Sequence, residues 1–162
     1  MIIEKNKAVL LFRYNNYKKT DFIEEHNNAA DENGYVWMLK AGRKLIEAKL
    51  CQVKDESGIM ILKAPKNAGG NYYCAQIFNY WFGSPNKSMN FPVYYEELID
   101  DERLWQIESL DGTWLKIGKI TALSSETVQE LRLISNNKKI EDVIGSTMSS
   151  TLYVQSDKKL II

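Results

Sequence analysis

Residues 34–44 read GYVWMLKAGRK and mark the point where a helical pattern gives way to a strand. Upstream, side chains suited to one buried helix face recur at helical spacing, namely Phe22, Ile23, His26, Ala29 and Ala30. Gly34 is a typical helix stop, and residues 35–40 are rich in the aromatic and branched side chains that favour a strand. The stretch therefore predicts a helix ending at Gly34 and a strand after it. His26 lies on or beside the apolar stripe of that helix and is expected to be packed or half-exposed rather than a ligand.

The residues before this stretch predict one more strand. Residues 7–14, KAVLLFRY, form an apolar run of strand length and predict a buried strand. Thr20 is suited to cap the following helix, because Asp21 and Glu24 then fall in its first turn, near the positive end of the helix dipole.

The residues after it predict a helix and a hairpin. The apolar spacing favours a helix over residues 44–55, ended by Ser57 and Gly58. Residues 59–65, IMILKAP, read as a strand that Pro65 stops. Residues 72–81, YYCAQIFNYW, are expected to run back as its hairpin partner.

The last third of the chain alternates helical and strand patterns. Residues 93–105 predict a short acidic helix, and residues 112–123, GTWLKIGKITAL, predict a strand with a bulge at Gly118. Ser124 or Ser125 is expected to cap a helix over ETVQELRLI, residues 126–134. A short helix, KKIEDVIG, and a strand, TLYVQ, complete the prediction.

Length and composition indicate one ordinary domain. The chain has 162 residues, 44% hydrophobic and 26% charged, which is enough apolar material for one core. The strands cluster in the middle without regular crossover helices. We therefore expect a single α+β domain, residues 1–162, with a mixed, mostly antiparallel sheet or a small barrel flanked by helices.

Several classes of site lack a sequence basis. No apolar run approaches the roughly 20 residues of a membrane helix, and the N-terminus has no apolar signal region, so we expect a cytoplasmic protein with no membrane partner. Cys51 and Cys74 are expected to be two reduced, buried thiols rather than a disulfide. Because His26 is the single histidine, zinc sites built from several histidines are excluded. Nucleotide-binding glycine motifs and nucleophile elbows are absent from the sequence.

Charge is unevenly distributed along a chain of zero net charge. Residues 40–90 hold eight basic and three acidic side chains, whereas residues 91–113 hold one basic and seven acidic. Because the whole chain has no net charge, binding to a polyanion would have to be local. The alternative is two solvated faces of opposite sign.

Two carboxylate patterns invite a metal hypothesis. Glu97 and Asp101 lie four residues apart in the acidic segment 96–102, a spacing at which magnesium could bridge them, although a solvated acidic face also explains them. Asp31 followed by EAK at residues 47–49 copies the acidic pattern of some nucleases. That chemistry needs a strand, whereas the EAK residues fall in a helical pattern.

Aromatic residues overlap the basic block. Four tryptophans, Trp37, Trp81, Trp105 and Trp114, and most of the tyrosines lie between residues 35 and 114. Rings that stack on bases beside cations that neutralise phosphate are typical of a single-strand or flipped-base site. The same rings are also typical of a strand-rich core.

The order of elements from Gly34 onward resembles a PUA-like domain of the EVE type. The similar pieces are GYVWMLKAGRK with its helix, IMILKAP, YYCAQIFNYW, and GTWLKIGKITALS leading into VQELRLI. The resemblance implies a small mixed barrel that reads a modified base in an aromatic cage. It implies Trp37, Trp81 and Trp114 as the cage, and Lys40, Arg43 and Lys44 as phosphate contacts. We expect no cofactor.

The sequence thus favours a binding domain over an enzyme, with DNA or RNA carrying an exposed or modified base as its ligand. One alternative is a protein-interaction or regulatory domain, for example in phage defence, that uses the acidic segment 96–102 against a basic partner. A metal-dependent nuclease is the third hypothesis.

Overall fold

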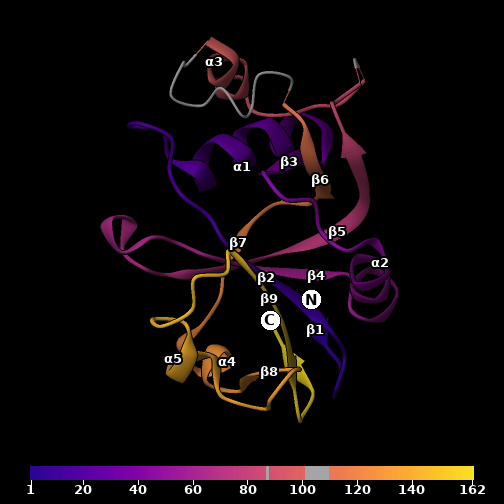
Figure 1. The fold of residues 1–162 in the computed structure, drawn as a ribbon, viewed down its shortest axis with the longest axis vertical. Helices are drawn as coiled ribbons and strands as arrows, with labels where there is room; N and C mark the ends of the chain where they lie inside the picture. The colour runs from indigo at the N-terminus through magenta and orange to yellow at the C-terminus, as the bar shows by residue number, and fades with distance from the viewer. Residues whose placement is uncertain (87, 101–109) are drawn as a thin grey trace.

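A computed structural model describes residues 1–86, 88–100 and 110–162 (Figure 1). The strands are β1 (Ile2–Ile3), β2 (Val9–Arg13), β3 (Val36–Ala41), β4 (Ile59–Lys63), β5 (Tyr72–Gly83), β6 (Gly112–Ile117), β7 (Thr121–Ala122), β8 (Leu131–Leu133), β9 (Thr151–Ser156) and β10 (Leu160–Ile161). The helices are α1 (Phe22–Asn33), α2 (Glu47–Glu56), α3 (Tyr94–Asp100), α4 (Ser125–Gln129), α5 (Ile140–Val143) and a short 3-10 helix, η1 (Lys66–Ala68). The predicted α+β class is confirmed.

The main sheet has eight strands and is mixed. Its order is β3-β6-β5-β4-β2-β9-β8, with β7 beside β5, while β1 and β10 form a separate pair. Among the strands described, every pairing is antiparallel except that of β2 with β4. Because no described pairing joins β3 to β8, the sheet is open rather than a closed barrel.

Strand β5 bends and connects the two halves of the sheet. Residues 72–76 pair with β4, and the strand then continues along β6 to Gly83. The register shifts between Ile77 and Asn79, so a bulge lies in β5 rather than at Gly118 as predicted. A bulge bends its strand and increases the local twist, and β5 curves visibly between the two halves (Figure 1).

The centre of the sheet is buried on both faces. In β2, Leu10 packs into the cluster under α1 and α2, whereas Val9 and Leu11 pack into a second cluster with Leu131 and Val154. Strand β4 divides in the same way, which explains why both strands are apolar at consecutive positions rather than at alternate ones. A third cluster lies under α3 and is described with the site below.

Helix α1 begins and ends at defined caps. The Asp21 carboxylate accepts hydrogen bonds from the N–H groups of Ile23 (3.0 Å) and Glu24 (3.1 Å), so Asp21 rather than the predicted Thr20 is the N-cap. Gly34 has φ = 75° and its N–H donates to the Ala30 carbonyl, which confirms the predicted stop.

Two predicted elements have different limits in the structure. Helix α4 ends at Gln129, and residues 131–133 form strand β8 because Leu131 and Leu133 both turn inward while the backbone pairs with β9. The strand expected over residues 112–123 divides into β6 and β7, since the N–H of Gly118 donates to the Gln76 carbonyl between them.

The outer edge of β3 is covered. The N–H of Trp37 donates to the Asn90 carbonyl (2.7 Å), and the N–H of Leu39 donates to the Tyr95 hydroxyl (3.1 Å). The Asn90 amide donates in turn to the carbonyls of Ala29 and Tyr35, which holds this segment in place. The edge strand therefore presents partnered backbone groups at these positions.

Two expectations concern the chain as a whole. Both cysteines are free thiols, as predicted. Cys74 is buried as expected, whereas the expectation of a buried thiol was wrong for Cys51, which is partly exposed on α2. Within the described residues, no helix is both long enough and apolar enough to cross a membrane.

Gly112 tests the packing of β6 against β3. A Cβ at this position would lie 2.6 Å from the Lys40 carbonyl oxygen and 2.8 Å from Leu39 Cδ1. We expect Gly112→Ala to lower the free energy of unfolding by about 1–3 kcal/mol, because overpacking forces the strands apart. Urea denaturation followed by circular dichroism measures this change.

The matched control is Gly145→Ala, because no atom lies within 4 Å of the position its Cβ would occupy. This variant is expected to change stability by less than about 1 kcal/mol. Equal losses in the two variants would contradict the close packing of β6 on β3.

Candidate functional site

The three predicted cage tryptophans lie on one face of the sheet. Trp114 pairs with Trp81 on one side and with Leu39 on the other, and Trp37 lies two residues before Leu39 in β3. Since alternate residues of a strand share a face, the register places all three side chains on the face that bears the cluster under α3.

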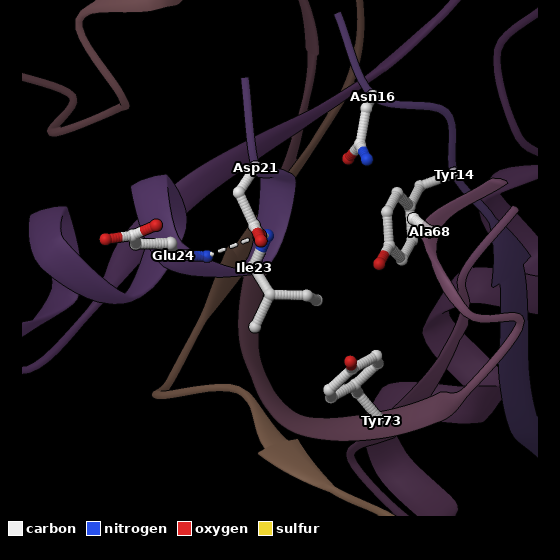
Figure 2. Close-up of a pocket in the computed structure, with 7 residues that line it drawn as sticks. All are labelled: Tyr14, Asn16, Asp21, Ile23, Glu24, Ala68 and Tyr73. Atoms are coloured by element: carbon white, nitrogen blue, oxygen red, sulfur yellow. Dashed lines mark hydrogen bonds between the residues drawn. The ribbon is translucent and has the colours of Figure 1, made fainter. Parts of the chain in front are cut away.

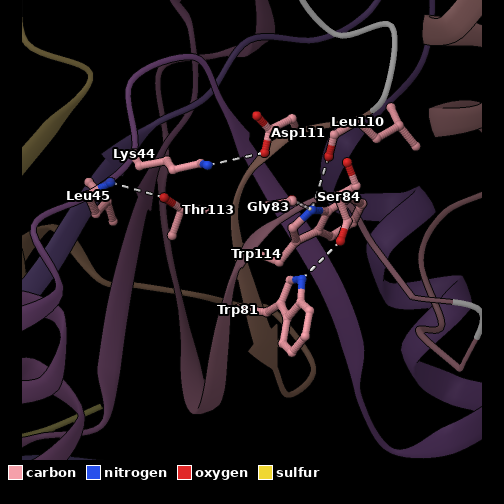
Figure 3. A network of polar contacts seen from close by, with 9 residues as sticks. All are labelled: Lys44, Leu45, Trp81, Gly83, Ser84, Leu110, Asp111, Thr113 and Trp114. Carbon is pink, nitrogen blue, oxygen red and sulfur yellow. Dashed lines mark hydrogen bonds and ion pairs between the residues drawn. The ribbon is translucent and has the colours of Figure 1, made fainter.

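These tryptophans differ in exposure. Trp114 is completely buried, and its indole N–H lies 3.1 Å from the carbonyls of both Gly83 and Leu110 (Figure 3). Trp81 is 44% exposed, and its indole N–H donates to the Ser84 carbonyl at 2.9 Å. Trp37 packs, partly buried, against the cluster under α3. Trp114 thus fills the core, whereas Trp81 presents a ring at the surface; Trp105 lies outside the described residues.

The three predicted phosphate contacts occupy different environments. Lys40 is buried, and its ammonium group donates to the Arg43 carbonyl. Burial lowers the Lys40 pKa, and the Arg43 guanidinium lowers it further. Lys44 forms an exposed ion pair with Asp111 at 3.4 Å (Figure 3). Arg43 is exposed. Because neighbouring strand residues alternate, Lys40 projects from the face opposite Trp37.

A hollow of about 370 Å³ lies where the carboxyl end of β2 meets α1, α3 and the end of β3. We call it the aromatic pocket. Six rings line it, from Phe12, Tyr14, Tyr17, Phe22, Tyr94 and Tyr95. Arg13 and Lys40 are its charged residues, and its described lining includes no carboxylate. Of the six residues predicted to bind the ligand, Lys40 is the one that reaches this hollow.

The rings of the aromatic pocket are ordered by stacking. Tyr14 stacks on Phe22 with 4.3 Å between ring centroids, and Tyr17 stacks on Tyr94 at 6.2 Å. Tyr17 is partly exposed, whereas Tyr14, Phe22 and Tyr94 are buried. The pocket therefore has a floor of buried rings and a more accessible ring at Tyr17.

Buried His26 supports the pocket from behind. Its Nδ1 lies 2.7 Å from the Phe22 carbonyl, which only accepts, so Nδ1 carries the proton. Nε2 then accepts from the Tyr95 hydroxyl (2.7 Å), which itself accepts the Leu39 N–H. This chain of hydrogen bonds joins α1, α3 and β3, and three of its members also line the pocket.

A smaller hollow of about 210 Å³ lies next to the aromatic pocket (Figure 2). It shares Tyr14 and Asn16 with that pocket but includes Asp21 and Glu24, so its charge is opposite. The Asp21 carboxylate is already occupied as the cap of α1. Burial, with the Tyr73 and Asp21 side chains, raises the Tyr14 pKa to about 12, so Tyr14 stays protonated.

The metal hypotheses have limited support in the described residues. Within them, no group of three or more His, Cys, Asp or Glu side chains is arranged to hold a metal ion. Asp101 and Glu102 of the acidic segment lie outside the described residues. Glu47 and Lys49 lie in the first turn of α2, not on a strand, and Asp31 pairs with Lys119 at 2.7 Å.

Sequence reasoning missed Tyr14 and Tyr17 because residues 15–19 read as a plain loop. The available signal was the composition of FRYNNY, residues 12–17, where aromatic side chains alternate with Arg and Asn directly after a buried strand. Residues that follow the carboxyl end of a strand are frequent sites of function.

His26 makes stability depend on pH. Burial lowers its pKa to about 4 from an ordinary value of 6.5, so the unfolded chain binds the proton more tightly. The stabilisation is complete above about pH 6.5 and is lost as the pH falls toward 4, by about 3 kcal/mol in total. Urea denaturation between about pH 7 and 5.5 isolates this effect, because carboxyl groups titrate near pH 4.

The control is His26→Gln, which leaves no histidine in the chain. This variant is expected to be less stable at neutral pH and to have a flat stability profile over the same interval. An unchanged slope in His26→Gln would contradict the assignment of the pH dependence to His26.

In comparisons with known proteins, no protein-family model, no curated protein and no solved structure matches this chain significantly.

Proposed function

We propose that this protein binds nucleic acid and holds an exposed or modified base in the aromatic pocket. The observation that carries the proposal is the composition of that pocket, with six rings, two cations and no carboxylate in its described lining. Aromatic faces stack on bases, at about 1–3 kcal/mol per base, and cations neutralise phosphate. The volume of about 370 Å³ lies within the usual range of small-ligand sites, about 300–1,000 Å³.

The tyrosines add polar groups to this apolar surface. Burial raises the pKa of Tyr14, Tyr94 and Tyr95, so their phenols stay protonated at neutral pH. A neutral phenol offers a hydrogen-bond donor without adding negative charge beside a phosphate. Tyr95 already donates to His26, and the Tyr94 hydroxyl is hydrogen-bonded to that of Tyr95, which leaves Tyr14 as the candidate to contact the edge of a base.

The proposed ligand class is the one that the PUA-like resemblance implies, but the residues proposed to stack on the base are different. Tyr14 and Tyr17 take the role expected of the tryptophans, because Trp114 is buried with its indole N–H on backbone carbonyls. Trp81 keeps an exposed ring and remains a second candidate for stacking. The DNA or RNA identity of the ligand follows from which oligonucleotide binds.

A protein-interaction role is the second candidate. Glu96 and Glu97 are exposed on α3, next to the residues of that helix that line the aromatic pocket. A basic protein partner would be recognised by these carboxylates. Co-purification with a protein, together with no binding to any oligonucleotide, would favour this role over nucleic-acid binding.

The test is fluorescence anisotropy with labelled single-stranded DNA and RNA. Tyr17→Leu replaces the ring and its hydroxyl with a smaller apolar side chain, so we expect the free energy of binding to weaken by about 1–3 kcal/mol through loss of stacking. The matched control is Phe78→Leu, which removes a ring that is 43% exposed on β5 and outside the pocket lining.

Trp81→Leu separates the two aromatic surfaces. Loss of binding in Trp81→Leu with none in Tyr17→Leu would move the site to the tryptophan face. No binding of either oligonucleotide to the unaltered chain would overturn the proposed function. Circular dichroism of each variant checks that the fold is retained.

A further inference from the structure

A second hollow, of about 610 Å³, adjoins the aromatic pocket. We call it the basic groove. Its charged lining residues are Arg13, Lys63 and Lys66, and its described lining includes no carboxylate. The loop residues Thr147, Ser149 and Ser150 also line it. Three cations together with hydroxyl groups and backbone make a surface suited to an anion.

The topology places two of these cations side by side. Arg13 and Lys63 are in register at the carboxyl ends of the parallel strands β2 and β4, and adjacent strands lie about 4.7–4.9 Å apart. Lys66 follows on η1. Burial lowers the Lys63 pKa, and the charges of Arg13 and Lys66 lower it further, so like charges are held together here.

Uncharged groups hold Arg13 and Lys63 in place without cancelling their charge. Arg13 Nη1 donates to the carbonyls of Thr147 (2.6 Å) and Ser149 (3.3 Å). The Lys63 ammonium donates to the Gly70 carbonyl and lies 4.4 Å from the centroid of the Tyr72 ring. In the part of the chain that the structure describes, no carboxylate forms an ion pair with any of the three.

One acidic side chain affects this region without lining the groove. The Glu141 carboxylate on α5 raises the pKa of Tyr72, whereas Arg13 lowers it, and neither Glu141 nor Tyr72 lines the groove. The positive charge of the groove is therefore balanced by carbonyl dipoles and a ring face rather than by a paired carboxylate.

We propose that the basic groove binds backbone phosphates of an unpaired nucleic-acid strand. The groove shares Arg13, Tyr14, Asn15 and Ser150 with the aromatic pocket, so the two hollows meet along one short segment. A ligand that fills both places a base on one side of this segment and its phosphates on the other. A base stacked inside a duplex is not available for that arrangement. The phosphate site is inferred from the groove alone. The inference that one nucleic-acid strand fills both hollows rests on the proposed function.

The test measures how binding depends on salt. Lys66 is exposed, and Lys66→Gln removes one cation without reversing charge. For a single strand, we expect the slope of log affinity against log salt to fall by about 0.7. The matched control is Lys5→Gln. Lys5 is exposed and precedes the amino end of β2, whereas Arg13 lies at the carboxyl end of that strand. Lys5→Gln is expected to leave the slope unchanged.

Three probes distinguish failure of the groove from failure of the base pocket: a single-stranded oligonucleotide, an abasic oligonucleotide of equal length, and the matching duplex. Lys66→Gln is expected to lower the salt slope for the first two, while Tyr17→Leu weakens the first and leaves the abasic probe unchanged. The duplex is expected to bind more weakly than the single strand.

Each failure has a different reading. If Lys66→Gln lowers the salt slope but Tyr17→Leu does not weaken binding, the phosphate site is supported and the base pocket is overturned. An effect of Tyr17→Leu with equal slopes for Lys66→Gln, Lys5→Gln and the unaltered chain overturns the phosphate site and keeps the proposed function. Duplex binding equal to that of the single strand overturns the unpaired-strand requirement.

Discussion

The parallel pairing of β2 with β4 is the constraint on which the rest of the structure depends. Parallel neighbours need a long crossover, and here residues 14–58 provide it with α1, β3 and α2. This crossover sends β3 to the far edge of the sheet, where it pairs with β6. It also brings the carboxyl ends of β2 and β4 together, so the residues that follow them line adjoining hollows.

Local elements were predictable because they depend on neighbouring residues. Gly34 ends α1 through its own positive φ, and the apolar runs of β2 and β4 follow from burial on both faces. Thr20 was the wrong cap because Asp21, one residue later, reaches the N–H groups of Ile23 and Glu24. Leucine favours a helix, but Leu131 and Leu133 lie two residues apart, a spacing that puts both on one face only in a strand. Pairing with β9, distant in sequence, makes this segment a strand.

The site was less predictable because it depends on which strands become neighbours. Alternation alone places Trp37 on the face opposite Lys40, but the burial of Trp114 follows from its pairing with Leu39 and Trp81 and from the cover that α3 provides. Tyr14 and Tyr17 become pocket residues through contacts with α1 and α3 that no local pattern encodes. The ligand class was inferred from residue types, whereas its location needed the topology.

The Tyr95 hydroxyl has a consequence beyond the pocket that it lines. It accepts the Leu39 N–H on the open side of β3, and Asn90 accepts the Trp37 N–H beside it. An edge strand with free N–H groups is a template on which a second chain can add a strand. Tyr95 and Asn90 therefore occupy positions at which a second chain could pair with β3. A substitution of Tyr95 that improves the pocket would also expose this edge, and the resulting aggregation would limit its selection.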